Sequence, residues 1–414
     1  KTYKTKIMAK PKLALIPATQ GSKLYSVLPA DGVGDFTFSR NSAATRINKD
    51  GLIETVAVGK SRLNYPLIDG VVNGCPSHLL EPERLQKIQY SEAFNETYWN
   101  KSNTNVVSGQ LSPKGDLSAF KLVEDTNNAE HKITRFVGVS TAAGTIHSEF
   151  MYVKANGKNK VTLYDAGFSG KYTTFDLSLG TVISSNCSNF GIEQFTNGWF
   201  KISQTLNQVS SGNAIFNFYL LNDSYASGSP SGFTSYQGDG TSGIYIFGAQ
   251  LEQGSFPTSY IPNYGTSAGI TRVAETATGA GDASTFNDSE GVLMAEISAL
   301  ANIGSFENIS LSNGSSASRV FLFYRNSLNL MEFRVTVNNS IQMVFQHTIA
   351  DAKTSNKFAI KYKENDFALW INGVEEGTDI SGITNVANTL NTLNFNDSTS
   401  FPLFGKVKQL QVYD

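Results

Sequence analysis

Short runs in which polar and apolar residues alternate recur along most of the chain, and turn-forming residues separate them. Examples are Ile146–Lys154, Tyr172–Leu177 and Gly243–Gln250. Because successive side chains of a strand point to opposite faces of a sheet, such runs predict strands with one buried face. Many strands at short spacing, with almost no helical periodicity, are typical of a β-sandwich or a jelly roll. The sequence therefore predicts an all-β fold of tandem β-sandwich or jelly-roll domains with an N-terminal anchoring region.

The runs group into four predicted segments. Residues 1–34 are expected to be an N-terminal attachment segment, 35–89 a connector with short strands and a short helix, 90–275 a jelly roll, and 276–414 a second sandwich. The last boundary is placed at Ala277–Asn287, because this stretch consists mostly of small and polar residues.

Local signals predict one short helix and three tight turns. Glu81–Ile88 is the predicted helix, since it has a proline near its start and carboxylates close to the positive end of the helix dipole. Asp50-Gly51, Asn338-Asn-Ser340 and Asn372-Gly-Val374 are predicted hairpin connections.

Composition excludes several classes of function. The chain of 414 residues carries 33 Lys and Arg against 35 Asp and Glu, a net charge of −2, which argues against a nucleic-acid partner. No apolar run approaches the roughly 20 residues of a membrane helix, so no membrane insertion is expected. Charged residues are only 16 %, against about 25 % in an average domain, so Ser, Thr, Asn and Gly must supply the surface polarity. Cys75 and Cys187 are predicted to be two buried or unreactive thiols.

The first two thirds of the chain resemble a known module. Phe36–Arg46, Asp50–Glu54, Arg62–Tyr65, Leu79–Pro82 and Tyr90–Phe94, with Trp99 after them, look like the opening module of bacteriophage virion fibre proteins. Its usual exit is matched by Gly248–Gly254, Thr258–Pro262 and Thr271-Arg272, so the resemblance covers residues 35 to 273. In such proteins the module is similar to carbohydrate-binding jelly rolls. The Leu85–Ile88 stretch departs from the family, which more often has Thr-Asn-Leu there.

The last 130 or so residues resemble a laminin-G or concanavalin-like module, through Lys357–Val374 and the closing Gly405–Tyr413. Together, the two resemblances imply a structural or adhesive component of the virion surface, such as a tail or head fibre, which is often a homotrimer. They imply host surface glycans as partners, and we expect residues 1 to about 30 to attach to other virion proteins.

Catalytic signatures are mostly missing. The four histidines, at positions 78, 131, 147 and 347, show no metal-binding spacing, and neither a Gly-x-Ser-x-Gly elbow nor a phosphate-binding loop occurs. We therefore predict no catalytic residues, no resident metal and no enzyme.

A polysaccharide depolymerase is kept as an alternative, because a glycosidase needs only two carboxylates, whose separation the sequence does not encode. Glu149, Asp165, Asp176 and Glu252 are the candidates, although we expect them to be solvent-facing strand positions. Glu252 is instead expected to accept structural hydrogen bonds that tie the exit strand to a neighbour.

The best candidate for ligand binding is the glycine-rich loop 221–240, because sugars stack on aromatic rings and bond to amide and carboxylate groups. Its candidate ligand-binding residues are Asn222, Asp223, Tyr225, Phe233, Tyr236, Gln237 and Asp239. The alternative is an ordinary loop at a trimer contact or a sandwich rim. Trp199 and Trp370 are predicted core residues, and Trp99 could cap the jelly roll.

Sandwich modules of this kind often hold calcium through loop carboxylates, for which Asp282, Asp288, Glu290 and Asp397 are candidates. No Asp-x-Asp-x-Asp-Gly pattern supports them, so no cofactor is predicted and calcium stays an alternative. The leading hypothesis is adhesion by a virion fibre or decoration protein. A purely architectural capsid, tail or neck protein is the second hypothesis, and the depolymerase is the third.

Overall fold

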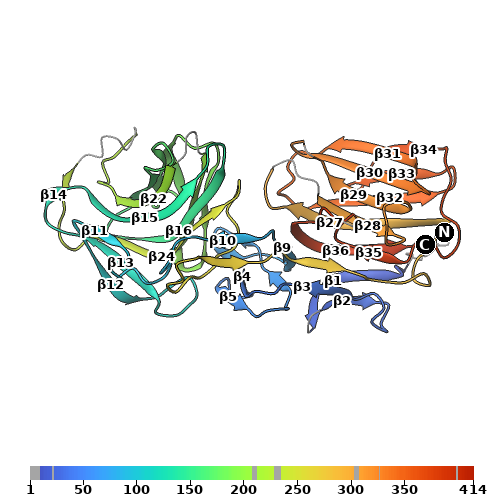
Figure 1. Ribbon diagram of the computed structural model, residues 1–414, viewed down its shortest axis with the longest axis horizontal. Coiled ribbons are helices and arrows are strands. Elements are labelled where there is room, and N and C mark those ends of the chain that lie inside the picture. The colour runs from blue at the N-terminus through green and yellow to red at the C-terminus, as the bar shows by residue number, and fades with distance from the viewer. Residues whose placement is uncertain are drawn as a thin grey trace, which may run out of the picture.

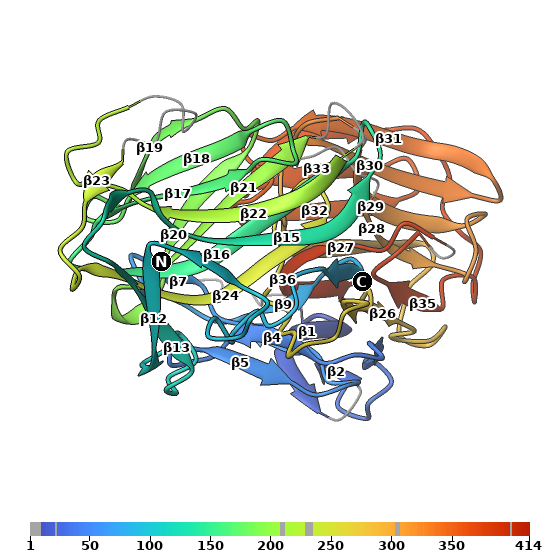
Figure 2. The same cartoon turned by 60° about the vertical axis from the view of Figure 1, so that its left-hand side comes forward.

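The computed structural model describes residues 10–20, 23–207, 212–227, 235–302, 307–325, 327–397 and 400–414. It is all-β: apart from one 3-10 turn, η1 (Thr196–Gly198), the described residues contain strands and no α-helix. Two β-sandwiches lie side by side, with the early strands below them (Figure 1, Figure 2). The tandem-sandwich prediction is confirmed.

The first sandwich is the predicted jelly roll, built from two six-stranded sheets. One sheet has the order β12 (Thr104–Gln110), β13 (Ala119–Glu124), β24 (Gly243–Gln253), β16 (Ile146–Asn156), β21 (Phe200–Asn207), β20 (Phe190–Gln194). The other has the order β11 (Asn100–Ser102), β15 (His131–Thr141), β22 (Gly212–Leu220), β17 (Lys160–Asp165), β18 (Lys171–Asp176), β19 (Thr181–Ser185). A short pair, β14 (Asn128–Ala129) with β23 (Tyr236–Gln237), lies at one end.

The second sandwich combines an eleven-stranded and a five-stranded sheet. The main path of the larger sheet is β26 (Thr276–Thr278), β3 (Phe36–Ser39), β2 (Lys23–Leu28), β1 (Leu13–Gln20), β36 (Gly405–Tyr413), β27 (Glu290–Ala299), β32 (Asn356–Lys363), β33 (Phe367–Ile371), β34 (Val374–Asp379). The smaller sheet has the order β31 (Ser340–Thr348), β30 (Leu330–Val337), β29 (Arg319–Tyr324), β28 (Glu307–Ser312), β35 (Thr392–Asn394).

Short strands of the connector join the two sandwiches. β9 (Ser77–Leu80) pairs with both β36 and β6 (Arg62–Asn64), and so adds to the larger sheet. The remaining pairs are β4 (Ala44–Ile47) with β5 (Ile53–Val56), β7 (Leu67–Ile68) with β8 (Val71–Val72), and β10 (Arg84–Gln86) with β25 (Ile270–Arg272).

The beginning of the chain is part of the second sandwich, which differs from the separate attachment segment expected at residues 1–34. β1 pairs with β36, where Leu13 faces Val412 and Leu15 faces Leu410. Leu13, Leu15 and Phe36 are buried in the same core as the C-terminal strands. A pairing between strands almost 400 residues apart leaves no local trace in the sequence, so only the tertiary structure reveals it. Residues 1–9 lie outside the described residues.

The prediction of a helix at Glu81–Ile88 is also wrong. Residues Arg84–Gln86 form strand β10, which pairs with β25 in the register Arg84 to Arg272. Tertiary contacts override local propensity here, because the extended chain places the buried carboxylate of Glu81 against two arginines.

The three predicted hairpin connections are confirmed. Val337 pairs with Ser340 and Ile371 with Val374, so two of the connections have only two residues. Asp50-Gly51 lies in the longer loop between β4 and β5, where Ile47 pairs with Ile53. Asn338 and Asn339 have φ of 49° and 65°, values that Asn tolerates better than most residues and that suit a twisted hairpin.

The buried apolar side chains of the described residues form three clusters. One fills each sandwich, and the third packs the connector and the residues after β24 onto the outer face of the jelly-roll sheet that contains β16 and β24. Trp199 lies in this third cluster and is fully buried, as predicted, and Trp99 is buried in the jelly roll. Trp370 is only half-buried, because Leu369 and Ile371 take the inward positions of β33.

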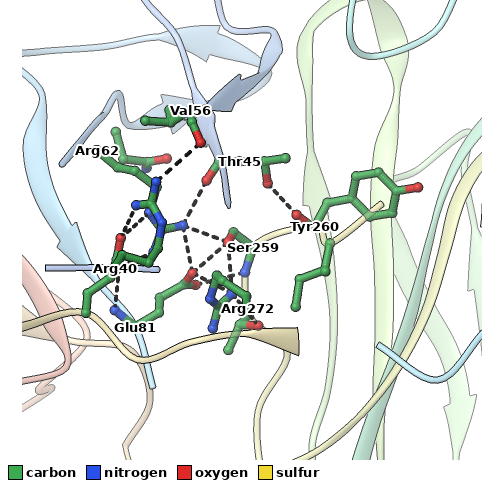
Figure 3. Close-up of polar contacts among 12 residues, drawn as sticks. Arg40, Thr45, Val56, Arg62, Glu81, Ser259, Tyr260 and Arg272 are labelled. Atoms are coloured by element: carbon green, nitrogen blue, oxygen red, sulfur yellow. Dashed lines mark hydrogen bonds and ion pairs between the residues drawn. The ribbon is translucent and has the colours of Figure 1, made fainter. Parts of the chain in front are cut away.

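A buried ion network lies where the connector meets the end of the jelly roll (Figure 3). Glu275 bonds Arg40 at 2.6 Å and pairs with Arg62, while Glu81 bonds Arg62 at 2.8 Å and Arg272 at 2.9 Å. All five side chains are at most 4 % exposed. The two arginines beside Glu81 hold the pKa of its carboxyl well below its usual range against the opposing effect of burial.

Glu275→Gln should be strongly destabilising. Removing the carboxylate charge leaves Arg40 and Arg62 buried without full compensation, which costs about 3–5 kcal/mol when a buried pair is broken. Chemical denaturation of the two proteins measures the loss. The matched control is Glu290→Gln at the exposed pair with Lys363, which should change stability by less than about 1 kcal/mol. Equal effects of the two substitutions would contradict the role given to the network.

Candidate functional site

The described part of the predicted ligand loop lies at one end of the jelly roll, beside β14 and β23. Asn222, Asp223 and Gln237 are exposed, and Tyr225 is half-buried. Asp223 Oδ1 accepts a hydrogen bond from the Asn159 backbone at 3.0 Å, and Gln237 Nε2 donates to the Thr126 carbonyl. Phe233 lies outside the described residues.

Tyr236 and Asp239 belong to a cluster centred on Glu124, which was not among the residues predicted from the sequence. The Tyr236 hydroxyl donates to Glu124 Oε2 at 2.6 Å, Lys158 Nζ lies 3.2 Å from the same oxygen, and the Asp239 backbone donates to Oε1 at 3.0 Å. Tyr236 is only 7 % exposed, so its ring has little face left for a sugar. Burial, and then the bond to Glu124, raise the pKa of Tyr236.

This end of the jelly roll is therefore closed by its own contacts. Asp239 accepts bonds from the backbones of Thr241 and Ser242, and the bonds from Ser242 are the main cause of the lowered pKa of Asp239. His131 is fully buried, with its two ring nitrogens 2.7 and 3.2 Å from the carbonyl oxygens of Asn103 and Tyr236. Of the predicted ligand residues in the described ranges, Asn222, Asp223, Gln237 and Asp239 are exposed, although the carboxylate of Asp239 is already bonded within its own turn.

None of the four candidate carboxylates faces solvent, which corrects the expectation for Glu149, Asp165 and Asp176. Glu149, Asp165 and Glu252 are fully buried, and Asp176 is 7 % exposed. Glu252 accepts bonds from the Thr258 backbone at 2.6 Å and the Thr258 hydroxyl at 2.8 Å, which confirms its structural role beside the exit strand. Alternation counted along a single strand shows neither which of its faces points into the core nor whether the other face is covered, so the outward prediction failed.

Glu149 and Asp165 lie on facing sheets and both point into the jelly-roll core, because they alternate in phase with the core residues Met151 and Leu163. Burial raises the pKa of Asp165 to about 6, and burial together with the charge of Asp165 raises that of Glu149. Gln204 donates to Glu149 Oε1 at 2.6 Å, while Oε2 has no partner within the described part of the chain. Neither carboxyl lines the cavities described below.

The calcium candidates are used by the fold. Asp288 accepts bonds from the backbones of Thr389 and Leu390, Asp282 from those of Ser284 and Thr285, and Asp397 from that of Ser400, while Glu290 pairs with Lys363. The described residues contain no group of three or more His, Cys, Asp or Glu suited to hold a metal ion.

Cys187 is buried, Cys75 is exposed, and both are free thiols. Within the described ranges, no helix is long and apolar enough to cross a membrane.

A groove runs between the two sandwiches along β20, the edge strand of its sheet. It contains cavities of about 560 Å³ and about 590 Å³ and a smaller one of about 170 Å³, and Glu193 of β20 lines all three. The two larger volumes lie in the range of about 300–1,000 Å³ that is usual for ligand sites, which occur often at domain boundaries.

The groove lining combines aromatic rings with amides. Phe190 is 45 % exposed beside Asn189 in one large cavity, and Phe200 lies with Asn64 and Gln194 in the other. The sequence does not predict these residues as a site, because they come from segments far apart in the chain that only the packing of the two sandwiches brings together.

No protein-family model matches the chain, and no curated protein does. Among solved structures, mouse laminin alpha1 domains LG4-5 match at 10 % identity, covering 79 % of this chain and 91 % of that one, with a TM-score of 0.25.

A tandem of two CBM22 domains from Paenibacillus barcinonensis Xyn10C matches at 10 % identity, covering 79 % of this chain and 97 % of that one, with a TM-score of 0.24. The LG1-3 region of the laminin alpha2 chain matches at 11 % identity, covering 87 % and 67 %, with a TM-score of 0.18. TM-scores this low do not establish a common arrangement, so the fold class stands on the sheets described above.

Glu149→Gln should stabilise the protein at alkaline pH. The folded-state pKa values of Glu149 and Asp165 are raised, so the contribution of the pair to stability is full below about pH 4 and is lost as the pH rises through about 6. An amide at position 149 carries no charge and still accepts the bond from Gln204. We expect a gain of about 1 kcal/mol or more at pH 8 and little difference at pH 5, measured by denaturation at both pH values.

The control is Glu83→Gln, because Glu83 is exposed. This variant should follow the wild type at both pH values. A Glu149→Gln variant that is no more stable at pH 8 than the wild type would show that ionisation of the pair carries no cost.

Proposed function

We propose that this protein is a non-enzymatic component of a bacteriophage virion, a fibre or decoration protein that adheres to glycans of the host surface. The groove along β20 carries the proposal, since its volume and its mixture of exposed ring and amide groups suit an oligosaccharide. The resemblance of residues 35 to 273 to the opening module of virion fibre proteins supports a place on the virion surface.

We further propose that the chain acts as a homotrimer and contacts other virion proteins through its N-terminal region. Shallow sites bind single glycans weakly, and three copies held together raise the effective concentration of the second and third site. Because β1 to β3 belong to the second sandwich, that sandwich is the part next to the virion in this arrangement.

Two other functions are each favoured by one observation. The closed end of the jelly roll, where the fold uses Tyr236 and Asp239, favours a purely architectural virion protein. The facing carboxyls of Glu149 and Asp165 favour a depolymerase, since a glycosidase needs such a pair. Their full burial is the reason why adhesion is preferred.

The purified chain should bind bacterial surface polysaccharides on a broad glycan array and release no reducing sugar from those that it binds. An array without any bound glycan would instead favour the architectural function. Release of reducing sugar that is abolished in Glu149→Gln would establish the depolymerase. A monomer by mass photometry would contradict the trimer.

A further inference from the structure

We infer that the groove along β20 binds a linear, uncharged oligosaccharide that contacts both sandwiches at once, an inference that rests on the proposed glycan-binding function. Three features of the groove lead to this ligand: its two walls, its length and its charge.

The two walls come from different sandwiches. Asn189, Phe190 and Glu193 belong to the jelly roll, and Asn302, Lys353 and Lys406 belong to the second sandwich or the turns next to its strands. A ligand in the groove therefore contacts groups that neither sandwich presents alone. The ammonium groups can donate hydrogen bonds to sugar hydroxyls, the carboxylates can accept them, and the amides can do both, while the exposed ring of Phe190 can stack on a sugar face.

The length of the groove favours a chain of sugars over a single one. The cavities of about 560 and about 590 Å³ adjoin at Glu193, so a ligand that fills both must pass this residue in an extended form. An edge strand also has one row of backbone N–H and C=O groups that no neighbouring strand pairs, and such groups are further partners for hydroxyls along its length.

The charges of the two large cavities balance. The residues that carry charge at neutral pH are two lysines, Lys353 and Lys406, and two carboxylates, Asp69 and Glu193. The lysines attract an acidic polysaccharide, but the carboxylates repel it. A basic polysaccharide is attracted by the carboxylates and repelled by the lysines. A saccharide without charge can use all four groups as hydrogen-bond partners, so its binding should depend little on salt.

Titration of the full-length protein with defined sugars tests this assignment. The probes are malto-, cello-, xylo-, manno- and chito-oligosaccharides from monosaccharide to hexasaccharide, with oligogalacturonates as the acidic comparison. We expect a neutral series whose affinity rises with length beyond the disaccharide and changes less than about twofold between about 0.05 M and about 0.5 M NaCl.

Substitutions on the two walls test the site itself. Phe190→Ala and Lys406→Ala, one on each wall, should each weaken that binding about five- to tenfold. The matched controls are Phe136→Ala, at a similarly exposed ring of the jelly roll, and Lys408→Ala, two residues further along β36. Neither control residue lines the three cavities, so both variants should bind like the wild type. Unchanged thermal unfolding confirms that each variant folds.

The outcomes separate this inference from the proposed function. Three results overturn the inference but leave adhesion in place. They are binding to oligogalacturonates only, equal affinity for the monosaccharide and the hexasaccharide, and weaker binding after substitution on one wall but not on the other. The same holds if no probe binds while the glycan array shows binding. If both the array and the probes show no binding, the proposed function itself fails.

Discussion

Five buried charged side chains fix how the parts of this molecule meet. Glu81 and Glu275 bond three arginines, Arg40, Arg62 and Arg272, in a region closed to water. Removing such ions from water costs several kcal/mol each, and the cost is offset only when every partner is in place with good geometry. The network therefore holds the connector, the exit of the jelly roll and the edge of the second sandwich in one arrangement. The smallest cavity of the groove is lined by Glu81 and Ser259, so the groove borders directly on this network.

The same network explains what the motifs of the sequence resemblance do in the fold. Its arginines and carboxylates lie in or beside the motifs that resemble virion fibre modules, at both the opening and the exit of the jelly roll. Arg62 and Glu275 are 213 positions apart, yet they share two contacts. The motifs thus mark where a distant pair of chain segments closes, which is a requirement of the fold and not of a ligand. They do not by themselves assign a binding site.

Polar groups buried inside the jelly roll separate into two kinds. Glu124 and Glu252 have several hydrogen-bond donors around them and hold adjacent turns in place. Glu149 and Asp165 both point into the core, where burial raises the pKa values of both carboxyls. The closed end at Glu124 leaves the boundary between the sandwiches as the surface with the larger hollows. The adhesive function proposed above therefore depends on contacts between domains more than on any one loop.

The sequence by itself determined the all-β class, the strands with alternating residues and the tight turns such as Asn338-Asn339, because these depend on periods of two and on local backbone preferences. It also located the structural role of Glu252. Only the tertiary structure decided that β1 completes the C-terminal sheet, that Arg84 lies in a strand, and that Glu149 is buried. It alone assembled the groove at Glu193. The reason is physical: edge pairing, coverage of a second sheet face and cavities at a boundary arise from segments hundreds of residues apart, and local patterns carry no information about which segments will meet.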